Sequence, residues 1–189
     1  MDEATQFGLY DSAFEKSSCG VGFLTRKDGK QTHELLVKGH EALCAVPHRG
    51  GMSAEGVGDG AGVSVDLSVE FFNKVTNSKL TPGEFGVANF FLPNDPSQHQ
   101  SARELVVLAL EAQGMKILVT RDVQVDNSVL RPASVKYQLP IAQWVFAAPA
   151  GVRGTQLDKV IHKALLAIES KAYTEVALDG LYPLSMSAQ

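Results

Sequence analysis

The sequence is poor in cysteine, in positive charge and in long hydrophobic runs. Two cysteines in 189 residues cannot form a disulfide framework. Lys and Arg number 17 against 21 Asp and Glu, the formal net charge is -4 and no basic block stands out, so a nucleic-acid surface is not expected. No apolar run approaches the roughly 18 residues of a membrane span, and the N-terminus lacks the regions of a secretory signal. These absences favour the reducing cytoplasm.

Apolar residues make up 44% and charged residues 20% of the chain, which is ordinary composition for a globular protein. The length suffices for one domain with a sizeable core. Apolar periodicity predicts strands at 20–25, 62–67, 85–92, 115–120, 141–147 and 184–187, and helices at 32–46, near 71–75, at 98–113 and at 156–172. Ser97 and Thr155 are the expected helix caps and Gly114 a helix stop. Residues 123–139 form a long loop, and the pattern indicates an α+β or α/β domain.

Cys19 opens the first expected strand and allows two interpretations. A free cysteine at such a place is commonly a small buried hydrophobe. Alternatively it is a nucleophile, which at neutral pH needs a base or a lowered pKa. Cleavage between Ser18 and Cys19 would place an α-amine, with a reference pKa of about 7.7–8.0, on the same residue as the thiol. That amine could act as the base.

Residues 48–62 are so rich in glycine that they predict positive φ angles or close backbone approach rather than a regular element. The segment contains no phosphate-binding motif. Arg49, which two glycines follow, could bind a carboxylate, orient a catalytic group, or pair with Asp59 or Glu55 and only hold the loop. The five histidines show no zinc-ligand spacing with the cysteines, so no metal site is expected. Cys44 falls on the apolar face of its helix and is expected in the core.

Six stretches of the sequence form a distinctive set, and they are Cys19–Phe23, Glu41–Gly51, Gly58–Gly62, Phe71-Phe72, Gly83–Val87 and Asp122–Leu130. Taken together they resemble one family, the N-terminal class II glutamine amidotransferase (Ntn-hydrolase) domain of the glutamate synthase large subunit. The resemblance runs from about Gly8 to the end. It implies an αββα sandwich of the α+β class that is incomplete at the C-terminus. It also implies that residues 1–18 form a propeptide-like extension and residues 19–189 the N-terminal part of the amidotransferase domain.

The resemblance implies a mechanism. With the propeptide removed, the Cys19 thiolate attacks the side-chain amide of L-glutamine and forms a γ-glutamyl thioester, which water hydrolyses. The ammonia passes to a second centre of the parent protein, which carries FMN and an iron–sulfur cluster. There it is added to 2-oxoglutarate, and reduction gives a second glutamate. Expected partners are the remainder of the large subunit and either a small subunit or ferredoxin. The electron donor is left open, and no cofactor is expected in this chain.

Arg49 and Gly50 match the family's loop beside the nucleophile and are expected to support Cys19; Asp59 and Gly60 match a neighbouring loop. The family also uses an Asn-Gly pair as oxyanion hole, and this chain contains no Asn-Gly dipeptide. Loss of one oxyanion donor typically costs about 10²–10³ in rate, so this chain by itself is expected to be inactive, with exposed apolar edges. The alternatives are a stand-alone class II amidotransferase subunit and a non-catalytic module of the same fold.

Overall fold

The computed structural model describes residues 21–45, 60–175, 178 and 180–188. The chain divides into two compact units, Met1–Val65 and Asp66–Gln189.

The first unit has one regular element among its described residues, helix α1 (His33–Cys44). Thr32 caps it, because its side chain accepts a hydrogen bond from the backbone N–H of Leu35. No residue of α1 is buried, and Cys44 is exposed, so the core position expected for Cys44 is wrong. An amphipathic helix buries its apolar face only against a second apolar surface, and the described residues near α1 bury none of its side chains.

Two expected strands are also absent from the described residues. Residues 21–25 form no strand, and the side chains of Val21 and Phe23 are 94% and 87% exposed. Residues 62–67 are likewise without regular structure. A strand exists only where a neighbouring strand pairs with it, and no described segment pairs with either stretch. Apolar alternation alone was therefore insufficient to predict these two elements.

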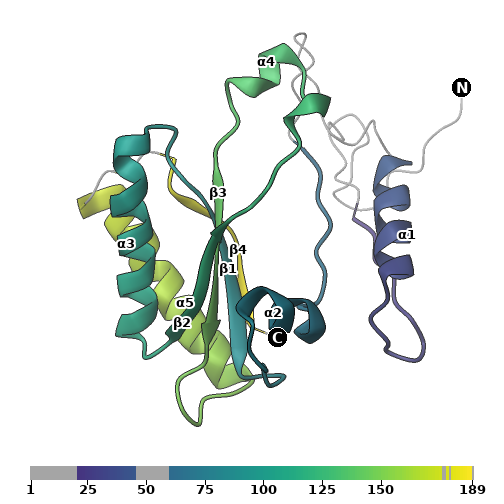
Figure 1. The fold of residues 1–189 in the computed structure, drawn as a ribbon, viewed down its shortest axis with the longest axis horizontal. Coiled ribbons are helices and arrows are strands. Elements are labelled where there is room, and N and C mark those ends of the chain that lie inside the picture. The colour runs from purple at the N-terminus through teal and green to yellow at the C-terminus, as the bar shows by residue number, and fades with distance from the viewer. Residues whose placement is uncertain (1–20, 46–59, 176–177, 179, 189) are drawn as a thin grey trace, which may run out of the picture. The chain divides into compact units, whose positions relative to one another are not determined.

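The second unit is built on a four-stranded sheet (Figure 1). Its strands are β1 (Phe85–Phe91), β2 (Lys116–Asp122), β3 (Ile141–Ala147) and β4 (Tyr182–Ala188). Their order is β2-β3-β1-β4, and all three pairings are antiparallel. The pairing of β1 with β3 is continuous over all seven residue pairs from Phe85↔Ala147 to Phe91↔Ile141.

Two helices, α3 (Pro96–Ala112) and α5 (Thr155–Ser170), cover one face of this sheet (Figure 1). Alternate residues of β1 and β3 point into the layer between sheet and helices, as the pleat requires. The main core lies there, and its largest fully buried members include Trp144, Phe90, Phe146, Leu110 and Leu157. Phe90 meets Trp144 edge to face, with ring centroids 5.9 Å apart.

The opposite face carries helix α2 (Val69–Thr76) near the start of β1. Phe72 of α2 packs with Leu80, Phe85, Val87 and Val145 in a second, smaller core. Two polar side chains, Asn89 and Gln143, follow on the same face of β1 and β3. We call this α2-bearing side of the sheet the open face, because α3 and α5 cover the other.

The helix caps differ from those expected. Asp95, not Ser97, caps α3, and its carboxylate accepts a hydrogen bond of 2.9 Å from the Ser97 backbone N–H. Gly154, which makes no side-chain hydrogen bond, precedes α5 in place of Thr155. A capping residue must have non-helical backbone angles, and Ser97 and Thr155 already lie inside their helices. Gly114, with φ of 77°, follows the end of α3 as expected.

Residues 123–140 leave the sheet as a long excursion between β2 and β3 (Figure 1). It contains a 3-10 turn, η3 (Asn127–Val129), and a single helical turn, α4 (Pro132–Val135). After α5 the chain continues as the π-helical turn η4 (Lys171–Glu175) before β4. The mixed helix and sheet class is confirmed. The described residues contain one sheet, so the second sheet of an αββα sandwich is not among them.

Candidate functional site

The residues expected to carry catalysis fall almost entirely in parts of the chain that the structure does not describe. Cys19, Arg49, Gly50 and Asp59 all lie outside the described residues. Gly60 is described; it is exposed and has a φ of 86°. This positive φ confirms, at one position, the backbone geometry that the glycine-rich loop predicts. The catalytic roles of these residues therefore stay predictions.

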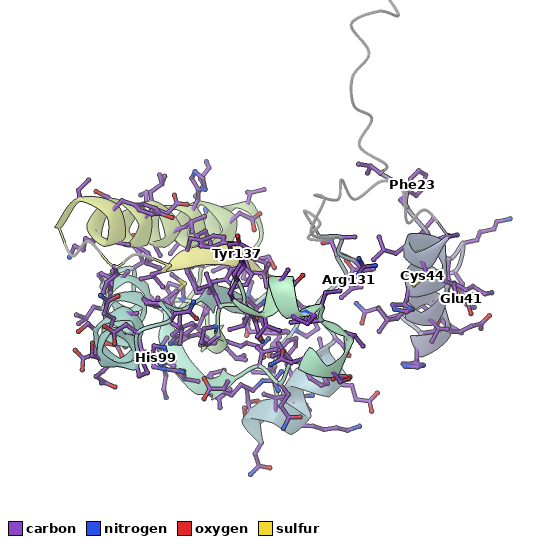
Figure 2. The ribbon with its side chains drawn as sticks, turned by 90° about the horizontal axis from the view of Figure 1, so that it is seen from above. Phe23, Glu41, Cys44, His99, Arg131 and Tyr137 are labelled. Atoms are coloured by element: carbon purple, nitrogen blue, oxygen red, sulfur yellow. The ribbon has the colours of Figure 1, made fainter. Side chains whose placement is uncertain are left out.

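A thiol and an imidazole do lie side by side on α1. The Sγ of Cys44 is 3.8 Å from Nε2 and 3.9 Å from Nδ1 of His40, one helical turn away. Figure 2 shows Cys44 and Glu41 on this short helix. A catalytic thiol–imidazole pair needs a third group to orient the base and a pocket for the substrate. The described residues supply neither around this exposed pair, so α1 is not a candidate active site.

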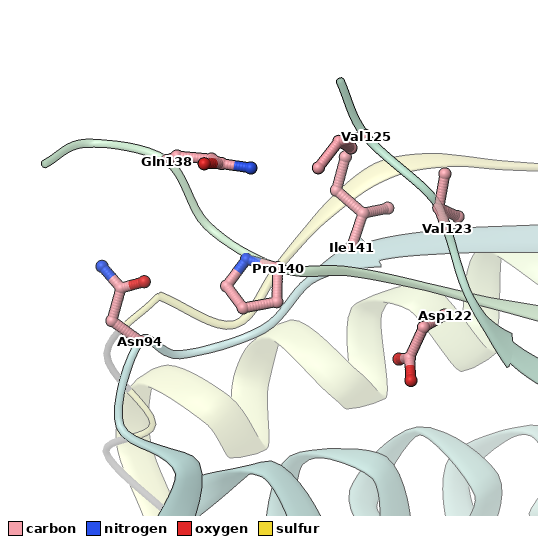
Figure 3. A pocket seen from close by; sticks show the side chains of 7 residues that line it. All are labelled: Asn94, Asp122, Val123, Val125, Gln138, Pro140 and Ile141. Carbon is pink, nitrogen blue, oxygen red and sulfur yellow. The ribbon is translucent and has the colours of Figure 1, made fainter. Parts of the chain in front are cut away.

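A cavity of about 340 Å³ lies where the excursion leaves the sheet (Figure 3). Its polar lining comes from Asn94, Asp122 and Gln138, and its apolar lining from Val123, Val125, Pro140 and Ile141. The Asp122 carboxylate forms an ion pair with Arg103 of α3. The cavity offers hydrogen-bonding groups to a small polar molecule. It contains no nucleophile paired with a base.

A second cavity, of about 470 Å³, runs along α3 and the edge strand β2. Trp144 is one of its lining residues and is itself fully buried. The Trp144 indole N–H has no hydrogen-bond acceptor in the structure. Because the ring is sealed from solvent, a molecule in this cavity would reach that N–H only after side chains moved apart.

Four polar side chains, one from each strand, are joined by hydrogen bonds in a row across the open face. Arg121 (β2) donates from Nε to Oε1 of Gln143 (β3) at 2.8 Å, and Gln143 donates from Nε2 to Oδ1 of Asn89 (β1) at 2.8 Å. Asn89 then donates from Nδ2 to Oγ of Ser185 (β4) at 2.8 Å. The four residues are direct cross-strand partners. We call them the polar row.

Sequence reasoning missed the polar row, although a signal for it was present. Asn89 and Gln143 are polar residues in the middle of otherwise apolar strands. A buried polar side chain requires a hydrogen-bond partner, so each predicts a polar neighbour on an adjacent strand. Which residues are neighbours depends on strand order and register, which alternation in one strand does not specify.

The described residues contain no group of three or more His, Cys, Asp or Glu side chains that could hold a metal ion. An iron–sulfur cluster is held mainly by Cys thiolates, and the whole sequence has two cysteines. The residues of this chain therefore do not fit such a cluster. Among the described helices, none has the length and apolar character needed to cross a membrane.

The chain is similar in sequence to the N-terminal regions of several glutamate synthases. It is 33% identical over 162 residues to the ferredoxin-dependent glutamate synthase 2 of Synechocystis sp., covering 83% of this chain and 10% of that protein. It is 31% identical over 190 residues to the glutamate synthase [NADPH] large chain of Azospirillum brasilense, covering 98% of this chain and 12% of that protein. The chain thus spans about a tenth of the length of these relatives.

The family comparison covers nearly the whole chain. The model of the class-II glutamine amidotransferases matches residues 19–189, so its first matched residue is Cys19. The mixed helix and sheet architecture with an antiparallel sheet agrees with the α+β class expected for this family. The chain belongs to the family of class-II glutamine amidotransferases.

Proposed function

We propose that this chain is the N-terminal part of the glutaminase domain of a glutamate synthase large subunit, with Cys19 as its nucleophile. The observation that supports this most directly is the start of the family match at Cys19. An N-terminal nucleophile must be the first residue of the mature chain, and the match leaves out residues 1–18. Their removal is part of the proposal.

The proposed reaction uses two groups of one residue. The Cys19 thiolate attacks the carbonyl carbon of the glutamine side-chain amide, and the C–N bond breaks. The α-amine of Cys19 has taken the proton of the thiol and passes it to the departing nitrogen, which leaves as ammonia. A γ-glutamyl thioester remains. Water then cleaves the C–S bond, releasing glutamate and regenerating the thiol. The α-amine suits this role, because its reference pKa of about 7.7–8.0 lies close to neutral pH.

Arg49 and Gly50 are proposed to support Cys19, and Asp59 and Gly60 to form the neighbouring loop. The positive φ of Gly60 is a backbone conformation that favours glycine in such a loop. A guanidinium in such a loop can hold a carboxylate by two parallel hydrogen bonds. Arg49 is thus proposed to act by positioning, and not as a proton donor.

The ammonia is proposed to serve glutamate biosynthesis by transfer to 2-oxoglutarate in other parts of the protein, with FMN and an iron–sulfur cluster. The relatives' names supply the support, since all those described are glutamate synthases. Those names include a ferredoxin-dependent and an NADPH type, so they leave the electron donor open. A cytoplasmic location is part of the same proposal.

Ammonia release from L-glutamine tests the proposal, measured on protein expressed from its complete gene. Replacement Cys19→Ser is expected to abolish release, whereas Cys44→Ser, at the exposed cysteine of α1, is expected to leave it unchanged. Equal activity of the wild type and the Cys19→Ser variant would overturn the proposal. The 189 residues expressed alone are expected to release no ammonia, because they contain no Asn-Gly pair.

A further inference from the structure

Trp144 on β3 carries a buried hydrogen-bond donor that has no acceptor. Its side chain is fully buried, and its indole N–H makes no hydrogen bond within the described part of the chain. A polar group that loses its bond to water on burial normally gains a partner inside the protein, and buried tryptophans follow this rule. An acceptor that comes from outside the described residues would therefore bind this N–H favourably.

The indole borders the cavity of about 470 Å³ that runs along α3 and the edge strand β2, two elements labelled in Figure 1. Thr120 on β2 is the direct cross-strand partner of Trp144 and lines the same cavity. Sites for small molecules are concave and commonly have volumes of about 300–1,000 Å³. The cavity is therefore large enough for a small molecule that meets the indole.

The outer wall of this cavity consists of side chains that can move. Gln100, Glu104 and Leu108 line it and follow one another at intervals of four along α3, so they form one row. All three are exposed, and exposed side chains change rotamer within nanoseconds. Rotation of this row is thus the expected way for a ligand to reach the sealed indole without unfolding of the helix.

The charges of the lining are already paired. Arg103 forms an ion pair with Asp122. Glu104 accepts a hydrogen bond of 2.6 Å from Nε2 of Gln100. The remaining lining is largely apolar, from Val107, Leu108 and the indole ring. An ion entering such a site would lose its water without gaining an opposite charge that is free to pair with it. The lining therefore favours an uncharged ligand.

We propose that the cavity between α3 and β2 binds an uncharged small molecule in which a carbonyl group adjoins an apolar body. The carbonyl oxygen accepts the hydrogen bond of the Trp144 indole N–H, and the apolar body packs against Val107 and Leu108. The inference does not depend on Cys19 or on glutamine hydrolysis, so the two proposals can fail separately.

Nuclear magnetic resonance tests this on the 189-residue chain, because Trp144 is its one tryptophan and gives a single indole N–H signal. The probe is acetophenone. Its control, α-methylstyrene, has the same ring and shape but carries C=CH₂ in place of C=O. We expect acetophenone to move the indole proton downfield in a saturating titration, with a dissociation constant roughly fivefold below that of α-methylstyrene.

Three variants separate the donor from the wall. Leu108→Ala shortens the apolar wall and is expected to weaken acetophenone binding by roughly threefold or more. Leu166→Ala, at an exposed leucine of α5, is the matched control and should leave binding unchanged. Trp144→Phe keeps an aromatic ring without the donor, so ligand-observed spectra should show equal binding of both probes. A backbone spectrum that matches the wild type shows that each variant is folded.

Three results would overturn the proposal. The first is an indole signal of the wild-type chain that acetophenone does not move. The second is an equal response of that signal to acetophenone and to α-methylstyrene, which would show that the carbonyl makes no hydrogen bond. The third is tighter binding of benzoate than of acetophenone, because it would show a site for anions.

Discussion

Gln143 on β3 lies directly opposite Asn89 on β1, and its Nε2 donates a hydrogen bond of 2.8 Å to Asn89 Oδ1. Gln143 is only 8% exposed, and it also accepts a hydrogen bond from Arg121. A one-residue slip of β3 would turn Gln143 into the apolar layer under α3 and α5, because adjacent strand residues point to opposite faces. The pair therefore helps to specify the register of the sheet.

Replacing Gln143 by Leu is expected to destabilise the second unit. The substitution leaves Asn89 and Arg121 without their shared partner in a nearly buried position, and an unsatisfied buried polar group costs roughly 1–3 kcal/mol. Chemical denaturation followed by circular dichroism measures the free energy of unfolding. Ser185→Ala is the control, because Ser185 is the exposed end of the polar row, and it should change that free energy by about 0.5 kcal/mol or less. A larger loss for Ser185→Ala than for Gln143→Leu would contradict this.

Gly86→Ala is expected to be poorly tolerated. A Cβ at this position would lie 2.5 Å from Cζ of Phe146 and 2.8 Å from the carbonyl oxygen of Ser187. Phe146 is fully buried and cannot move away freely, and overpacking of this kind costs roughly 1–3 kcal/mol. Thermal unfolding reports the effect. Gly62→Ala, where the added Cβ meets nothing within 4 Å, should leave the transition unchanged, and equal shifts for both variants would refute the packing argument.

Two leucines of α5 should respond differently to truncation. Leu157 is fully buried in the main core, whereas Leu166 is 52% exposed. Leu157→Ala is expected to lower the free energy of unfolding by roughly 2–5 kcal/mol through lost burial and the remaining cavity. Leu166→Ala should change it by less than about 1 kcal/mol. Urea titrations of both variants make the comparison, and similar losses would mean that α5 does not pack on the sheet as described.

The Asp95 cap should make the free energy of unfolding depend on pH in the acidic range. The backbone N–H of Ser97, followed by the Ser97 side chain, holds the pKa of Asp95 below its ordinary value of 3.8. A group with a lowered folded-state pKa adds stability that is fully present above the unfolded-state pKa. That stability is lost as the pH falls through the folded-state pKa.

Asp95→Asn keeps a capping oxygen but does not titrate. Its unfolding transition should therefore weaken less between pH 5 and about pH 2 than that of the wild type. Melting curves across this range test the difference, with Asp158→Asn in the first turn of α5 as the control at another helix start. Identical acid profiles of wild type and Asp95→Asn would exclude a contribution from this cap.

Much of the second unit follows from local patterns in the sequence. The strand expected at 141–147 agrees with β3 at both ends, because a run that is apolar except for Gln143 is bounded there by Pro140 and a turn. The helix expected at 98–113 matches most of α3, and Gly114 ends it with a positive φ. The four-stranded order and the polar row could not be predicted this way, since both depend on pairings between distant residues.

In the first unit, by contrast, local sequence patterns did not predict the structure well. Residues 20–25 have the composition of a strand, yet the described part, 21–25, is unpaired and Phe23 is 87% exposed. Cys44 lies on the expected helix but not in a core. Burial is a property of two surfaces, and an apolar pattern describes only one of them. For the candidate site, Cys19 was identified through a family resemblance, and its catalytic role stays a prediction because Cys19 lies outside the described residues.

The central claim is that Cys19 becomes an N-terminal nucleophile for glutamine. Intact-mass and peptide analysis tests it, on protein expressed from its complete gene and incubated with an electrophilic glutamine analogue. The account predicts a chain that begins at Cys19, lacks residues 1–18 and carries one adduct on that residue, with Cys44 unmodified. A reactive chain that still carries residues 1–18, or an adduct on Cys44 instead of Cys19, would contradict it.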